Sequence, residues 1–113
     1  MTPRLTSKFL VSALVRRVEI EGGHGAILAR GDAEAGAILL LCAERGVPQK
    51  LLERTLDFDR GYVWTACGPE NIDDSEALAA YIDRRRSRDP DLWLVELDIA
   101  HAERFAAETI AQG

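Results

Sequence analysis

The sequence predicts an α+β domain: a single, mainly antiparallel sheet of about five strands, with helices packed on one face. Two observations predict this class. Four strand-like segments follow one another between residues 25 and 67, and helical periodicity flanks that group on both sides. One further strand and one further helix follow the second helix, so the predicted order is α-β-β-β-β-α-β-α. With 113 residues the chain can bury one core, and we expect residues 1–113 to form a single domain.

The first predicted element is an amphipathic helix that begins after Thr6 or Ser7, either of which can cap its first amide groups. Its apolar residues recur at the helical period, and they are Phe9, Leu10, Ala13, Leu14 and Val18. The helix is expected to end at Gly22 and Gly23, because glycine readily adopts the left-handed conformation of a helix C-cap.

The four consecutive strands are predicted at residues 25–30, 37–43, 50–58 and 62–67. Segment 37–43 is apolar throughout, which predicts a central strand that is covered on both faces. Segment 50–58 alternates apolar and polar residues, as a half-exposed strand does. The connections are short, so consecutive strands are expected to be antiparallel neighbours.

The last part of the chain predicts a helix, a strand and a second helix. Asp73, with Glu76 three residues later, predicts the N-terminal cap of the helix, and the Asp89-Pro90 pair ends it by about residue 88. Residues 92–97 predict the fifth strand. Asp98 follows that strand and is placed to cap the terminal helix, which is expected to begin near residue 100.

Composition and charge disfavour several classes of protein. Lys and Arg number 14 against 19 acidic residues, and the net charge of −5 disfavours nucleic-acid binding. Cys42 and Cys67 have no CxxC spacing, so we expect neither a zinc cluster nor a disulfide framework, and a reduced, cytoplasmic protein. The sequence has no apolar run near the roughly 18 residues of a membrane span. Phosphate-loop, dinucleotide and nucleophile-elbow motifs are also absent, so no cofactor, metal or catalytic residue set is predicted.

Six charged residues are the candidates for a ligand-binding site: Arg16, Arg17, Arg30, Asp32, Arg85 and Glu96. Arg85 falls seven residues after Leu78 and continues the apolar stripe of its helix. Its planar guanidinium suits an anion or a carboxylate. The alternative is that its stem lies over the edge of the core with its head in water.

The other candidates also have two interpretations. Backbone amides beside Arg30 could hold a phosphate or carboxylate, whereas Gly31 and Asp32 are also what a tight turn uses. Arg16 and Arg17 could bind a ligand, but they also lie near the end of the first helix, where the negative end of the helix dipole favours cations.

Glu96 and Asp98 are two residues apart on one strand and therefore share a face. Such a pair could bind a divalent metal or share acid–base work. The structural interpretation, which we prefer, gives Asp98 the helix cap and leaves Glu96 facing water or an arginine.

Four segments occur in an order that resembles a known family: Ser12–Arg17, Arg30–Leu39, Tyr81–Arg84 and Asp89–Glu96. The chain is similar in these segments to the alphaproteobacterial family catalogued as domain of unknown function 1491. The resemblance spans roughly residues 4–98 and is weaker over 44–70. That family has no assigned activity, so the resemblance implies a bacterial cytoplasmic protein and supplies no catalytic residues.

Two functions remain open from the sequence. The first is a non-enzymatic protein-interaction or regulatory domain that acts through a protein partner or as a homodimer. It rests on the missing catalytic set and on segment 37–43, because helices on one face alone would leave that strand's other face uncovered. The alternative is a protein that binds a small molecule or anion with its arginines, with or without a weak enzymatic activity. Arginines that converge on one concavity favour the alternative, and scattered arginines favour the interaction domain.

Overall fold

The computed structural model describes residues 6–112, and the side chains of residues 6–109. The elements are α1 (Ser7–Ile20), β1 (His24–Ala29), β2 (Ile38–Glu44), β3 (Val47–Asp57), β4 (Gly61–Cys67), α2 (Ser75–Arg88), β5 (Trp93–Asp98) and α3 (Ala102–Gln112). The order α-β-β-β-β-α-β-α and the α+β class are therefore confirmed.

The five strands form one mixed, mostly antiparallel sheet in the order β1-β5-β2-β3-β4. The β2–β3 and β3–β4 pairs are antiparallel neighbours, as expected. The expectation fails for β1 and β2, because β5 lies between them, antiparallel to β1 and parallel to β2. Helix α2 explains the parallel pair, because it carries the chain back to the end of the sheet where β4 begins. Strand β5 then runs in the same direction as β4 and β2.

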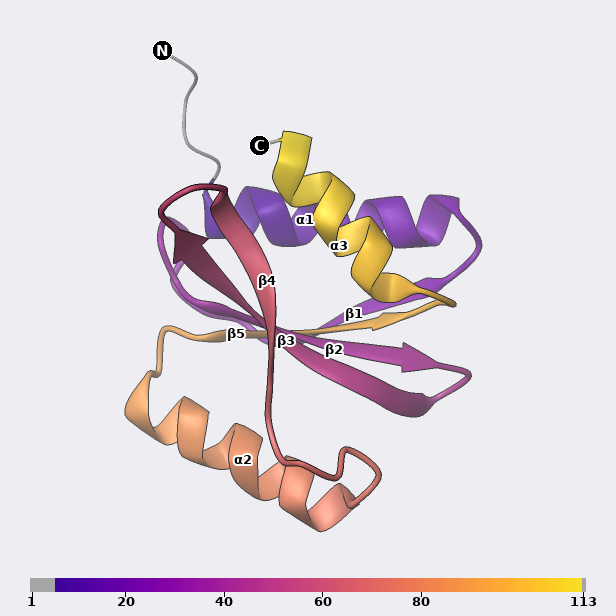
Figure 1. Cartoon of the computed structure of the whole chain (residues 1–113), viewed down its shortest axis with the longest axis vertical. Coiled ribbons are helices and arrows are strands. Elements are labelled where there is room, and N and C mark those ends of the chain that lie inside the picture. Colours follow the sequence, from indigo (N-terminus) through magenta and orange to yellow (C-terminus); the bar gives the residue numbers. More distant parts are fainter. Residues whose placement is uncertain (1–5, 113) are drawn as a thin grey trace.

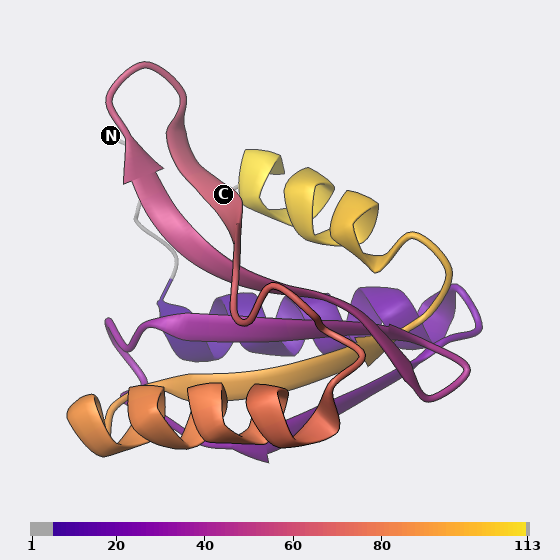
Figure 2. The same cartoon turned by 60° about the horizontal axis from the view of Figure 1, so that its bottom comes forward.

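Helices cover both faces of the sheet, which corrects the expectation that they pack on one face. Figures 1 and 2 show α1 and α3 on one side of the sheet and α2 on the other. The physical reason is the central strand β2, whose residues alternate between two separate cores. Leu40 and Cys42 pack with α1 and α3, whereas Leu39 and Leu41 pack with Leu78 of α2.

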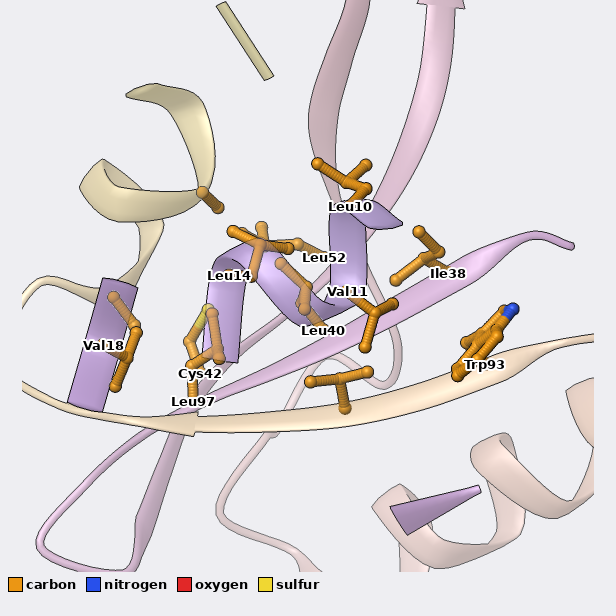
Figure 3. Close-up of a cluster of buried hydrophobic side chains, with 13 residues drawn as sticks. Leu10, Val11, Leu14, Val18, Ile38, Leu40, Cys42, Leu52, Trp93 and Leu97 are labelled. Atoms are coloured by element: carbon orange, nitrogen blue, oxygen red, sulfur yellow. The ribbon is translucent and has the colours of Figure 1, made fainter. Parts of the chain in front are cut away.

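The larger core lies between α1, α3 and the sheet (Figure 3). Helix α1 contributes four buried apolar side chains, which are Leu10, Val11, Leu14 and Val18. At the start of α1, the buried Ser7 hydroxyl donates to the Gly36 carbonyl at 2.6 Å. This bond holds the helix start against the loop that joins β1 to β2, and so ties α1 to the sheet.

Helix α1 has the predicted cap, whereas α2 has a different one. The Thr6 side chain accepts from the amide of Phe9, as a cap does. At α2 the cap is Asp74, whose carboxylate accepts from the Ala77 amide at 3.1 Å. The prediction of Asp73 was wrong by one residue. The helix begins at Ser75, so the residue directly before it, which is Asp74, forms the cap.

Asp98 does not cap the terminal helix, which corrects a second expectation. Its two carboxylate oxygens accept from the backbone amides of Arg45 and Gly46, each at 2.8 Å. Both turn residues have positive φ, 53° and 78°, in the tight connection between β2 and β3. The carboxylate therefore fixes the turn between the neighbouring strands, while α3 begins only at Ala102.

We predict that Leu40→Asp unfolds the protein, because Leu40 is fully buried in the larger core. An unpaired charge there costs several kcal/mol, roughly the whole stability of a small domain. Circular dichroism melts measure the effect, and Leu28→Asp at a half-exposed position of β1 is the control. A cooperative melt of Leu40→Asp near that of the control would contradict the burial of β2.

We also predict that Asp74→Ala lowers the free energy of unfolding by about 1 kcal/mol, since it removes the cap of α2. Asp73→Ala is a matched control, because the two residues are neighbours with the same charge and only Asp74 caps. Urea denaturation of both variants provides the measurement. Equal losses would show that charge near the helix start, rather than the cap, stabilises α2.

Candidate functional site

Strands β3 and β4 form a long hairpin whose end projects beyond the helices, which Figure 2 shows clearly. We call residues 50–67 the hairpin arm. Its register is continuous from Leu51 opposite Cys67 to Asp57 opposite Gly61. The end of the arm exposes two large apolar side chains, Leu56 at 67% and Phe58 fully.

The tip of the arm is held by Asp57. Its carboxylate accepts from the backbone amides of Asp59 and Arg60, at 2.8 and 3.1 Å. These two hydrogen bonds, followed by the nearby Arg60 guanidinium, lower the pKa of Asp57 below its ordinary value. The exposed apolar tip is therefore carried on a hydrogen-bonded turn.

A cleft of about 830 Å³ lies between the hairpin arm and α3. Apolar and aromatic side chains of the arm line it, including Leu52, Tyr62, Trp64 and Ala66, and Ala107 lines the α3 side. The Trp64 indole donates to the Ala106 carbonyl at 2.9 Å, which fixes the ring against the helix.

Three charged residues also line the cleft: Lys50 and Arg60 from the arm, and Glu103 from α3. The cleft thus combines a mostly apolar wall with a small excess of positive charge, on a chain whose net charge is −5. This composition suits binding of an apolar group with an acidic neighbour better than it suits acid–base catalysis.

Neither cysteine is prepared as a nucleophile. Burial, reinforced by Glu103, raises the pKa of the Cys42 thiol to about 12. Burial also raises the pKa of Cys67, a half-buried residue of β4, although a hydrogen bond with Tyr81 partly offsets the effect. Both thiols are protonated at neutral pH, whereas a reactive cysteine has a lowered pKa.

Arg85 forms the most developed polar cluster, on the α2 side of the sheet. Its guanidinium binds both carboxylate oxygens of Glu53 on β3, and it also donates to the Tyr81 hydroxyl at 3.1 Å. These side chains are partly buried, 23% exposed for Arg85 and 28% for Glu53. The hydrogen bonds to Glu53 raise the pKa of Arg85 further. The carboxylate that Arg85 was predicted to suit is thus supplied by the protein itself.

The two arginines of α1 lie on the opposite side of the sheet. Arg17 pairs with Glu108 of α3, and its guanidinium lies 5.4 Å from the centre of the Phe105 ring. Arg16 is exposed and lines a shallow hollow on the outer surface of α1, with Phe9 and Ile20.

The remaining candidates occupy two further places. Arg30 is exposed directly after β1. Asp32 stabilises the turn in which it lies. Its carboxylate accepts from the Ala35 amide at 2.9 Å, and its carbonyl accepts from the Trp93 indole at 2.7 Å. Glu96 is half-buried on β5, opposite Leu41 of β2.

The structure therefore does not bring the six predicted residues into one concavity, and their ligand-binding role stays a prediction. The cleft residues Lys50, Tyr62, Trp64 and Glu103 were not among them. The alternation in segments 50–58 and 62–67 places Trp64 on the same face as Tyr62, a signal available in the sequence. The position of α3 above that face could not be predicted from local pattern.

Among the described residues, no group of three His, Cys, Asp or Glu side chains is arranged to hold a metal ion. In the same part of the chain, no helix combines the length and apolar character needed to cross a membrane.

Comparison with known proteins identifies the family. The sequence model described as "Protein of unknown function (DUF1491)" matches residues 5–107. The chain belongs to the DUF1491 family. The resemblance seen in the sequence is therefore confirmed. A search of curated proteins found no match.

Solved structures of DUF1491 proteins have the same fold. An NMR structure of a family member from Caulobacter crescentus CB15 is 30% identical, with a TM-score of 0.75 over 92% of this chain and 94% of that one. A crystal structure of a DUF1491 protein from the same organism is 30% identical, with a TM-score of 0.76 over 90% and 94%. The solution structure of Atu0922 from A. tumefaciens is 31% identical, with a TM-score of 0.68 over 88% and 89%.

We predict that Arg85→Gln lowers the free energy of unfolding by about 1–2 kcal/mol, between the effects typical of exposed and of buried ion pairs. The reason is that Glu53 then keeps a partly buried carboxylate without its cation. Glu53→Gln combined with Arg85→Gln should cost less than the two single changes added together. Arg84→Gln on the exposed side of α2 is the control, and urea denaturation is the measurement. If Arg85→Gln is as stable as the wild type, the ion pair with Glu53 does not stabilise the fold. Arg85 would then be available to bind a ligand.

Proposed function

We propose that this DUF1491 protein is a protein-interaction or regulatory domain that binds a protein partner with its hairpin arm. The observation that carries the proposal is the exposed apolar tip, Leu56 and Phe58, next to the cleft lined by Tyr62 and Trp64. Large apolar side chains that are exposed beside one another typically mark a binding surface.

Aromatic side chains support the proposal further. Tyr and Trp are enriched where proteins bind one another, because each offers a large apolar area together with a polar group. Trp64 is held in place by its bond to Ala106, so its ring is ordered before binding. Lys50 and Arg60 at the cleft favour a partner segment that carries an acidic side chain beside its apolar ones.

A catalytic role has less support. The two thiols have raised pKa values, and Arg85 and Asp32 are occupied by contacts within the protein. The anion-binding alternative would need several arginines around one hollow. Arg17 is paired across to α3, and Arg30 lies apart from it in the connection after β1. We place the protein in the cytoplasm as part of the same proposal, on the basis of its two unpaired thiols.

The test is site-specific photo-crosslinking in the native bacterium. A photoreactive phenylalanine analogue at Phe58 should give protein adducts, because the proposed surface contains this residue. The same analogue at Phe9 is the matched control, since Phe9 is also an exposed phenylalanine but lies on α1. Phe58 without adducts, or adducts at Phe9 alone, would overturn the assignment of the binding surface.

A further inference from the structure

The two edges of the sheet differ in how they are protected against pairing with another strand. Strand β1, at one edge, contains a bulge between Ile27 and Ala29 that interrupts its register. Strand β4, at the other edge, pairs with β3 without any interruption. Bulges, prolines and charged residues are the devices that keep edge strands from associating. The β4 segment Val63–Cys67 has none of them.

Within residues 6–112, no strand lies on the outer side of β4, and Thr65 and Ala66 are exposed there. An uncharged, regular edge strand is a template for a further strand, whose backbone hydrogen bonds would extend the sheet. The edge alone does not say which chain supplies that strand, and the sequence around β4 decides this point.

We propose that the added strand is β4 of a second copy, so that the protein forms a two-fold homodimer. The inference rests on the proposed function, for which it names the partner. Antiparallel pairing of β4 with itself is isologous, as a two-fold interface requires. Pairing also requires that opposite residues point to the same face, so the two residue numbers of each pair add to an even number.

The register centred on Thr65 fits the residues of β4. It places Thr65 opposite Thr65 of the second copy, which is a favourable cross-strand pair. It places the large Trp64 opposite the small Ala66, and Val63 opposite Cys67. No charged side chain lies in this paired segment, so no like charges meet although each chain carries a net charge of −5.

Each end of the paired segment brings one arginine towards a carboxylate of the second copy, although Asp57 and Asp59 lie beside that arginine. Antiparallel pairing brings the Arg60 end of one β4 to the end that carries Glu70 in the second copy, twice in each dimer. Arg60 is well exposed, and its contact with Asp57 is long, 3.4 Å, so its guanidinium can bind a second carboxylate. The same arrangement places the tip with Phe58 beyond Cys67 of the second copy, past the end of the paired segment.

Sedimentation of the purified full-length protein from micromolar to millimolar concentration tests the proposal. The wild type should form a dimer, and Thr65→Lys should shift the equilibrium towards monomer at least tenfold, because two lysines would then face one another. Leu28→Lys at the bulged β1 edge is the matched control and should leave the dimer intact. Circular dichroism melts verify that both variants fold.

A second measurement reports the register. Thr65→Cys in a Cys67→Ala background should form an intermolecular disulfide on mild oxidation, because opposite residues of paired strands lie within reach of a disulfide. Leu28→Cys in the same background should stay monomeric on a non-reducing gel. Failure of Thr65→Cys to cross-link would overturn the register.

A monomeric wild type at every concentration, or a dimer that folded Thr65→Lys leaves unchanged, would overturn the β4 homodimer. If Phe58 nevertheless cross-links to a different protein in the cell, the proposed function stands and only the identity of the partner is wrong. If Phe58 gives no adduct, the proposed function itself fails.

Discussion

Burial of β2 on both faces is the constraint on which the rest of the structure depends. Ile38 and Leu40 face one core and Leu39 faces the other, and none of the three is exposed to solvent. A strand of this kind is stable only when apolar layers cover both of its sides. The chain meets this requirement with α1 and α3 on one face and α2 on the other, and the crossover through α2 returns β5 beside β2.

The same arrangement leaves one part of the sheet without cover. Strand β3 has 11 residues, longer than any other strand, and the helices reach only the part nearest the core. Beyond that part the arm is stabilised by its own ladder, by the hydrogen bond between the Thr55 and Thr65 hydroxyls, and by the turn at Asp57. The exposed apolar residues thus follow from the lengths of the elements.

The elements and their order could be predicted from the sequence because each element has a local pattern of apolar residues. The apolar stripe of α1 and the unbroken apolar run of β2 were both sufficient for this purpose. The exact cap of α2 could not be predicted, since Asp73 and Asp74 carry the same carboxylate and only the helix start distinguishes them. The insertion of β5 between β1 and β2 could not be predicted either, because the apolar pattern of a strand does not indicate which strands pair with it.

The candidate site was less predictable than the fold, for a related reason. The place of Arg85 on the apolar stripe of α2 could be predicted from the sequence, but its partner Glu53 lies 32 residues away and on another element. The cleft depends in the same way on the position of α3 over the arm. Interactions of this range are set by tertiary packing, which a single sequence does not display.

The central position of β5 also has a consequence for the order in which the protein is made. Strand β1 emerges from the ribosome early, yet its neighbour in the sheet is β5, which ends at Asp98. Strands β2, β3 and β4 can pair as soon as they have been synthesised, because they are consecutive neighbours. The nascent chain therefore holds α1 and β1 without their place in the sheet until β5 has been translated, and β5 then joins the two parts by pairing with both β1 and β2.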